Sequence, residues 1–153
     1  MGLAGDGTPR QVLAGAFRNY DPSLSPDARW MAYMSDESGR FEVYVRPYPG
    51  PGGRWQVSLN GGTEPVWSPT GREIFYRDGD RMMSATVRTQ GGFEVGVRAQ
   101  LFEGAYDQTQ GQFTNYDVSR DGRTFVMLQQ VQGTAQSVFV TLNWFGQLRR
   151  QQR

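Results

Sequence analysis

Three stretches of the sequence share one motif and decide the fold: Leu24-Ser25-Pro26-Asp27-Ala28-Arg29-Trp30, Trp67-Ser68-Pro69-Thr70-Gly71-Arg72-Glu73 and Val118-Ser119-Arg120-Asp121-Gly122-Arg123-Thr124. The second and third motif serines follow the first by 43 and then 51 residues. A period of roughly 40–50 residues is typical of repeats that each form one small antiparallel sheet. The chain is therefore predicted to be an array of such sheets, with a longer loop before the third motif.

Each motif has the composition of a tight turn between two strands. A proline in the first two motifs presets the backbone angle φ, and an aspartate in the first and third can bond to its own backbone. Gly71 and Gly122 accept the positive φ that such turns require, whereas Ala28 stands at the same position in the first motif. We expect backbone strain at Ala28.

Strand-like segments surround each turn. A continuous apolar run follows each motif, at residues 30–34, 74–76 and 125–128. Third strands are predicted at 42–45, 82–87 and 137–142, and fourth strands at 55–58 and 99–102. Since the runs do not alternate between apolar and polar residues, we expect each sheet to be covered on both faces. Residues 9–15 resemble residues 98–104, which predicts one more strand before the first motif.

The predicted fold is all-β, with three four-stranded antiparallel propeller blades that make up half of a six-bladed β-propeller. The whole chain, 1–153, is read as a single domain. The N-terminal strand lies at about 8–15, the blades at about 20–59, 63–104 and 114–145, and a tail at 146–153. The third blade has three strands of its own, and the N-terminal strand is expected to complete it from a partner chain. An open half-ring exposes sheet faces and edges, so we expect a homodimer that closes the six-bladed ring.

Composition excludes several kinds of chemistry. The 153 residues include no cysteine and no histidine, which removes thiolate chemistry, Ser-His-Asp hydrolysis and the usual zinc sites. Sixteen basic residues, all arginine, stand against fifteen acidic ones, and they are scattered along the sequence. We expect no nucleic-acid partner, no membrane partner, no cofactor and no metal. Residues 1–10 lack the apolar core of a secretory signal, so the default expectation is the cytoplasm.

A binding site is predicted where the first strand of each blade begins. Asp21, Glu64 and Asn115 stand four residues before the three motif serines, close to where the central channel of a ring would open. In an up-and-down meander the second strands end on the same side, which adds a second set of aligned residues: Ser35, Asp78 and Gln129. Two chains would place four carboxylates and two amides around one opening, a seat for a cation, an amine or an arginine side chain. The alternative is structural, because acids at strand starts commonly tie down neighbouring loops.

The turn motifs, the stretch from Gly61 to Pro69 and the ending Leu142-Asn143-Trp144-Phe145 resemble TolB-type, WD-repeat-like β-propellers. The resemblance extends over nearly the whole chain and is nearest to the C-terminal propeller halves attached to bacterial serine/threonine kinases and related sensor proteins. It implies an interaction or sensing module. Related repeats also accompany peptidases, where they control access to a separate catalytic domain.

Three hypotheses follow. The first is a non-catalytic binding or scaffolding module that holds a protein, peptide or small ligand at the channel mouth. The second is a detached accessory or sensor domain of a larger kinase or peptidase protein, with its other blades upstream. The third is an enzyme that uses carboxylates alone, such as a glycosidase or lyase, with Asp21, Glu64 and Asp78 paired across the ring.

Overall fold

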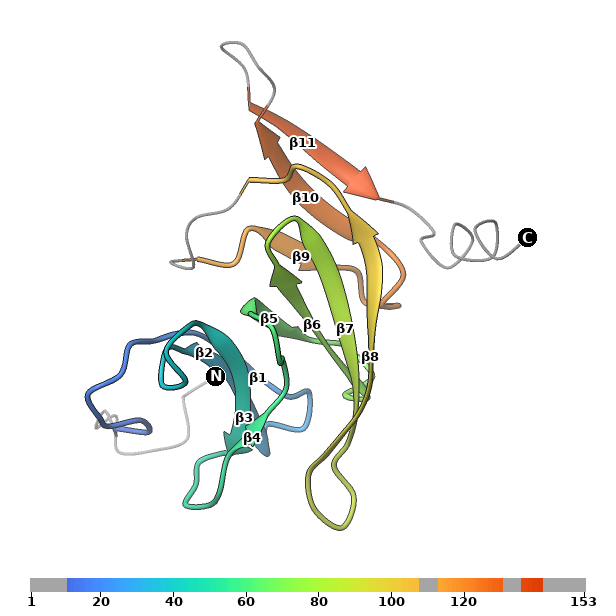
Figure 1. The fold of residues 1–153 in the computed structure, drawn as a ribbon. Coiled ribbons are helices and arrows are strands. Elements are labelled where there is room, and N and C mark those ends of the chain that lie inside the picture. The colour runs from blue at the N-terminus through green and yellow to red at the C-terminus, as the bar shows by residue number, and fades with distance from the viewer. Residues whose placement is uncertain (1–10, 108–112, 131–135, 142–153) are drawn as a thin grey trace, which may run out of the picture.

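A computed structural model of the chain describes residues 11–107, 113–130 and 136–141. These residues form eleven β-strands and no helix, which confirms the predicted all-β class. All sheet pairings are antiparallel, and within each sheet consecutive strands of the chain are neighbours. The three sheets follow one another in chain order, with the second sheet lying between the first and the third (Figure 1).

The sheets correspond to the predicted blades. Blade 1 contains β1 (Asn19–Leu24), β2 (Trp30–Ser35), β3 (Glu42–Pro47) and the short β4 (Trp55–Gln56). Blade 2 contains β5 (Thr63–Trp67), β6 (Glu73–Asp78), β7 (Arg81–Arg88) and β8 (Glu94–Glu103), and blade 3 contains β9 (Tyr116–Val118), β10 (Phe125–Gln130) and β11 (Gln136–Thr141). The fourth strand is shorter than predicted in blade 1 and longer in blade 2.

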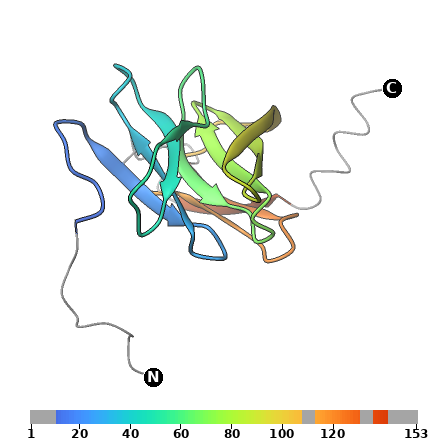
Figure 2. The same cartoon turned by 90° about the horizontal axis from the view of Figure 1, so that it is seen from below.

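Blades pack face to face, and the second strand of blade 2 contributes to both interfaces. Ile74 and Tyr76 pack against Trp30, Ala32 and other residues of blade 1. Phe75 lies between them in sequence and packs on the opposite face against blade 3, where its ring meets Phe125 edge-on at 5.0 Å between centroids. Because successive strand residues point to opposite faces, a strand covered on both sides needs apolar residues at every position. The unbroken apolar runs thus have their predicted cause, and Figure 2 shows the first two sheets side by side from below.

The three motif turns share one hydrogen-bond pattern. In the first, the Trp30 N–H donates to Ser25 Oγ at 3.0 Å, and Ser25 Oγ donates to Asp27 Oδ1 at 2.6 Å. In the second and third turns the motif serine Oγ likewise accepts a hydrogen bond from the backbone N–H five residues later. Hydrogen bonds from Ser25 and from the Arg29 N–H lower the pKa of the Asp27 carboxyl. Each turn thereby fixes the angle between the first two strands of its blade.

The predicted N-terminal strand is only partly within the described residues. Residues 8–10 lie outside them, and residues 11–15 form no strand in the single chain. Val12 and Leu13 nevertheless pack on the face of blade 1 that points away from blade 2, against a buried cluster of Met31, Tyr33 and Tyr44. The segment therefore covers a sheet face in the single chain, whereas the predicted strand pairing is with β11 of a partner chain.

Replacing Ala28 with glycine should stabilise the fold. Ala28 has φ of +53°, which costs an alanine about 1 kcal/mol. We expect a gain of about that size in the free energy of unfolding, measured by urea denaturation. The matched control is Gly122→Ala at the same position of the third turn, where φ is +70° and an added Cβ meets no atom within 4 Å. A loss of similar size is expected there, and equal effects of both substitutions would contradict the explanation.

Candidate functional site

We call the end of each blade where its first strand begins the mouth end, and the opposite end, with the motif turns, the turn end. At the mouth end Asp21 and Glu64 have the same unusual backbone, with φ of +50° and +55°. Each lies in a β-bulge, because the pairing register shifts between Tyr20 and Ser23 in blade 1 and between Thr63 and Val66 in blade 2. Bulges redirect side chains, so both blades turn their acidic residue in the same manner.

Glu64 joins blade 2 to blade 3. Its side chain is only 1% exposed, and its Oε2 accepts a hydrogen bond of 3.0 Å from the Asn115 N–H. The Tyr116 hydroxyl donates to the Glu64 backbone carbonyl at 2.7 Å. Two of the three predicted site residues, Glu64 and Asn115, are thus brought together. Their contact is a structural tie between the first strands of blades 2 and 3.

Arg77 lies next to this tie, and sequence reasoning missed it. The side chain is buried, with Nε and Nη2 donating to the Gly79 carbonyl at 3.2 and 2.9 Å, and its guanidinium lies 5.8 Å from the centre of the Tyr106 ring. Nη1 has no hydrogen-bond partner. The sequence carried a signal, because Arg77 takes the position held by Met34 in blade 1 and Leu128 in blade 3. A charge in an apolar alignment column points to a special environment.

Burial dominates the electrostatics of the cluster. It raises the pKa of the Glu64 carboxyl, an effect that the Asn115 N–H and the Arg77 charge oppose and that Asp21 and Asp107 reinforce. Burial also raises the pKa of Asp21, whose Oδ2 has no hydrogen-bond partner. The charges of Asp21, Asp107 and Arg77 therefore all act on the buried Glu64 carboxyl.

The second set of predicted residues is more dispersed. Ser35 is fully buried at the end of β2, and its Oγ has no hydrogen-bond partner. Asp78 forms an ion pair with Arg81 at 2.6 Å, and Gln129 is half-buried near the end of β10. All three lie at the mouth end. Among the described residues, no hydrogen bond or ion pair joins them to Asp21, Glu64 or Asn115.

Acidic residues are in excess at the mouth end and arginines at the turn end. This separation is not visible in the sequence, where both kinds of residue are scattered. The mouth end holds nine acids in or beside its loops: Asp21, Asp36, Glu37, Glu42, Glu64, Asp78, Asp80, Glu103 and Asp107. Five arginines accompany them, of which four form ion pairs and one is Arg77: Arg18, Arg40, Arg54, Arg77 and Arg81. The turn end holds six arginines and four acids: Arg29, Arg46, Arg72, Arg88, Arg120 and Arg123 with Asp27, Glu73, Glu94 and Asp121.

Large apolar side chains are also exposed at the mouth end. Phe17, Leu59 and Phe113 precede the first strands of blades 1, 2 and 3, and their exposed fractions are 53%, 53% and 66%. The segment before β1 is held to the segment after β2, because the Arg18 N–H donates to Asp36 Oδ1 at 2.9 Å. Exposed apolar groups around a polar opening are typical of a surface that binds another protein.

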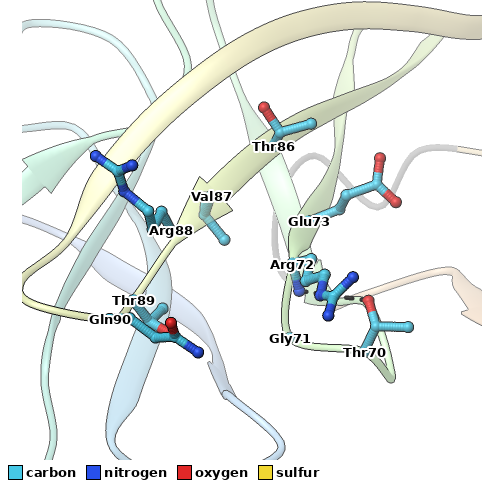
Figure 3. Close-up of a pocket in the computed structure, with 9 residues that line it drawn as sticks. All are labelled: Thr70, Gly71, Arg72, Glu73, Thr86, Val87, Arg88, Thr89 and Gln90. Carbon is cyan, nitrogen blue, oxygen red and sulfur yellow. Dashed lines mark hydrogen bonds between the residues drawn. The ribbon is translucent and has the colours of Figure 1, made fainter.

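The turn end of blade 2 carries an open groove of about 760 Å³ (Figure 3). Thr70, Arg72 and Glu73 form one side, and the β7 end from Thr86 to Gln90 forms the other. Burial raises the pKa of the Glu73 carboxyl. Within the described ranges no group of three acidic side chains has the arrangement of a metal site, and no helix is long and apolar enough to cross a membrane.

Comparison with known proteins places the fold. No family model matches the sequence. The chain is 29% identical over 111 residues to a Bacillus subtilis (strain 168) protein named Uncharacterized peptidase YuxL, a match covering 71% of this chain and 15% of that protein.

Two solved structures are similar. One is a protein assigned as TolB from Agrobacterium tumefaciens, with a TM-score of 0.58, 18% identity, and coverage of 84% of this chain and 46% of that one. The other is oligogalacturonate lyase from Vibrio parahaemolyticus, with a TM-score of 0.54, 15% identity, and coverage of 73% and 29%. The chain therefore has a TolB-like β-propeller fold and spans less than half the length of each of these proteins.

Substitution of Glu64 should separate its hydrogen bond from its charge. A raised carboxyl pKa means that the folded state holds a proton more tightly, so the stability of the native protein falls as pH rises above the ordinary glutamate value of 4.5. Glu64→Gln keeps a side-chain oxygen that accepts from the Asn115 N–H, and it removes the fall in stability with rising pH. Relative to the native protein, we expect its stability in urea to improve from about pH 4 to about pH 7.

Glu64→Ala is the matched comparison. It leaves the Asn115 N–H without an acceptor, so we expect a loss of about 1–3 kcal/mol in the free energy of unfolding at both pH values. A loss for Glu64→Gln that grows from pH 4 to pH 7 would contradict this explanation, because it would show that the charge of Glu64 contributes favourably.

Proposed function

We propose that the chain is a non-catalytic binding module that works as half of a six-bladed ring, closed by a second copy, and that holds a protein or peptide partner at the mouth end. The observation that carries this proposal is the open face of blade 3, together with the outer face of blade 1, on which the N-terminal segment packs. The binding site is built from the innermost strands of all three blades, so a second copy would complete the wall around the channel.

The open face of blade 3 is apolar. Phe125 and Met127 are buried against blade 2, whereas Val126 and Leu128 alternate with them and are 36% and 38% exposed. In blade 2 the corresponding face is covered by blade 3, and Phe75 on it is 1% exposed. Leaving this face of blade 3 in water forgoes the burial that each of the other interfaces provides.

The face of blade 1 supports closure from the other side. Val12 and Leu13 cover Met31 and Tyr33 there. Leu101, together with the partly buried Phe102, covers Phe125 and Met127 of blade 3 in the same way. Residues 9–15 also resemble residues 98–104, and Met31 and Phe125 each stand six residues after a motif serine. The N-terminal segment thus occupies the place of an outermost strand from a preceding blade.

The mouth end suits a positively charged partner segment with apolar side chains. Four of its arginines are already held by ion pairs and the fifth is buried, whereas Asp21 and Asp107 form no ion pair within the described residues. Phe17, Leu59 and Phe113 add exposed apolar surface around this acidic centre. Lysine or arginine side chains of a partner would meet unpaired carboxylates there.

The absence of histidine and cysteine from the sequence supports a non-catalytic role. Asp78 is paired with Arg81 and is not bonded to Glu64, so the carboxylate-only enzyme has less support than the binding module. A second candidate is an accessory domain of a longer protein. This candidate is favoured because the match covers only 15% of the length of the peptidase-named relative. In that case further blades of the same protein would cover the open faces.

Single-cysteine variants test ring closure on a background free of cysteine. The pairing of β7 with β8 joins Arg81 to Glu103 and Met82 to Phe102. Transferred to the ring, this register places Ala14 of one copy opposite Ser137 of the other, and Leu13 opposite Val138. Because antiparallel pairs alternate between wide and close spacing, one of the two pairs is expected to form a disulfide.

Mixing Ala14→Cys chains with Ser137→Cys chains, and Leu13→Cys chains with Val138→Cys chains, should give a cross-linked dimer under mild oxidation, seen on a non-reducing gel. Each variant alone should give far less. Leu128→Asp should suppress the cross-link by charging the open face, whereas Val97→Asp, on a residue 71% exposed on β8, should leave it unchanged. No cross-link in either mixture would contradict closure by a second copy.

A further inference from the structure

The motif turns place one arginine at the same position in every blade. Arg29, Arg72 and Arg123 each stand four residues after a motif serine. The backbone N–H of each donates to the side chain two residues earlier, at 3.2 Å to Asp27, 3.4 Å to Thr70 and 3.1 Å to Asp121. Since the three turns share one geometry, the arginines project from the same end of three neighbouring blades.

These arginines form no ion pair among the described residues, although the charges of Arg29 and Arg123 act on Asp27 and Asp121 in their own turns. Arg29, Arg72 and Arg123 are exposed, as is Arg120 beside the third turn, and none of them forms an ion pair within the described part of the chain. Arg88, in contrast, is paired with Glu94 at the same end. The mouth end has the opposite character, because its exposed arginines are held by acids. Among the described residues near the two ends, the exposed arginines that form no ion pair thus lie at the turn end.

The groove in blade 2 gives this surface a place for an anion. Arg72 and Thr70 line one side of the groove, and Arg88, which is paired with Glu94, lines the other side with Thr86, whose hydroxyl donates to the Val97 carbonyl (Figure 3). Glu73 lines the same groove, and burial raises the pKa of its carboxyl. Guanidinium groups bind carboxylates through two parallel hydrogen bonds, which hydroxyl donors can supplement.

We propose that the turn end is a second binding surface, distinct from the mouth, which takes an acidic segment of a partner protein across the arginines of neighbouring blades. Asp27 and Asp121 lie in the same turns as Arg29 and Arg123, and hydrogen bonds lower the pKa of both, so they stay ionised at neutral pH. A continuous polyphosphate backbone would meet these carboxylates, whereas separate side-chain carboxylates can reach the arginines and avoid them. The pattern therefore favours an acidic peptide over a nucleic acid. This surface lies within one chain and does not depend on ring closure.

Binding of fluorescein-labelled octaglutamate, followed by anisotropy at about 100 mM salt, where the Debye length is about 10 Å, tests the proposal. The variant R29Q/R72Q/R123Q should bind at least about ten-fold more weakly than the native chain. The matched control R18Q/R54Q/R81Q removes the same number of charges at the mouth end, from arginines whose acidic partners are partly exposed. It should retain affinity within about three-fold, because mouth-end arginines that lie more than a Debye length from octaglutamate bound at the turn end contribute little to its binding. Both variants should keep the native urea midpoint, since only exposed side chains change.

Two results would overturn the proposal. Equal losses of affinity in both triple variants would mean that octaglutamate responds to net charge alone. Tighter binding of labelled octathymidylate than of octaglutamate, abolished by R29Q/R72Q/R123Q, would assign the arginines to a nucleic acid in place of an acidic protein segment.

Discussion

Everything in this molecule depends on the stacking of one sheet face against the next. Each blade is too thin to bury its own apolar residues, so Ile74 and Tyr76 need blade 1 while Phe75 needs blade 3. The same requirement explains why a stack of three blades has an unsatisfied face at each end. Val12 and Leu13 cover the outer face of blade 1, whereas Val126 and Leu128 on the outer face of blade 3 remain exposed. The proposed ring closure, and with it the choice between a dimer and a longer protein, rests on that one constraint.

The stack also determines what the two ends can do. Every first strand begins at the same end, so the residues before it gather there whatever their distance in sequence. Glu64 and Asn115 are 51 residues apart and share a hydrogen bond, and the charge of Asp21, which lies in an equivalent bulge, acts on Glu64. The turn end gathers Arg29, Arg72 and Arg123 by the same rule. A repeat that encodes one charge per blade therefore encodes a charged surface, and this chain has one of each sign.

Sequence alone predicted the features that local chemistry determines. The serine turns, the strain at Ala28 and the two-sided apolar runs each depend on a few neighbouring residues, and each was found. The burial of Glu64 and the position of Arg77 depend on contacts between blades, which no local pattern encodes. The charge sorting escaped notice for a similar reason, because strand direction alternates and residues close in sequence fall at opposite ends. The N-terminal segment was read as a strand from its likeness to residues 98–104. Whether the N-terminal segment pairs with β11 depends on contact with a second chain.

The solution mass tests the central claim most directly, because the open faces must be covered by something. Light scattering coupled to size exclusion would measure it at micromolar concentration without any substitution. Closure by a second copy predicts a mass of twice 17.2 kDa that persists on dilution. A mass of 17.2 kDa would contradict it and would mean that the faces of blades 1 and 3 are covered by other blades or other proteins.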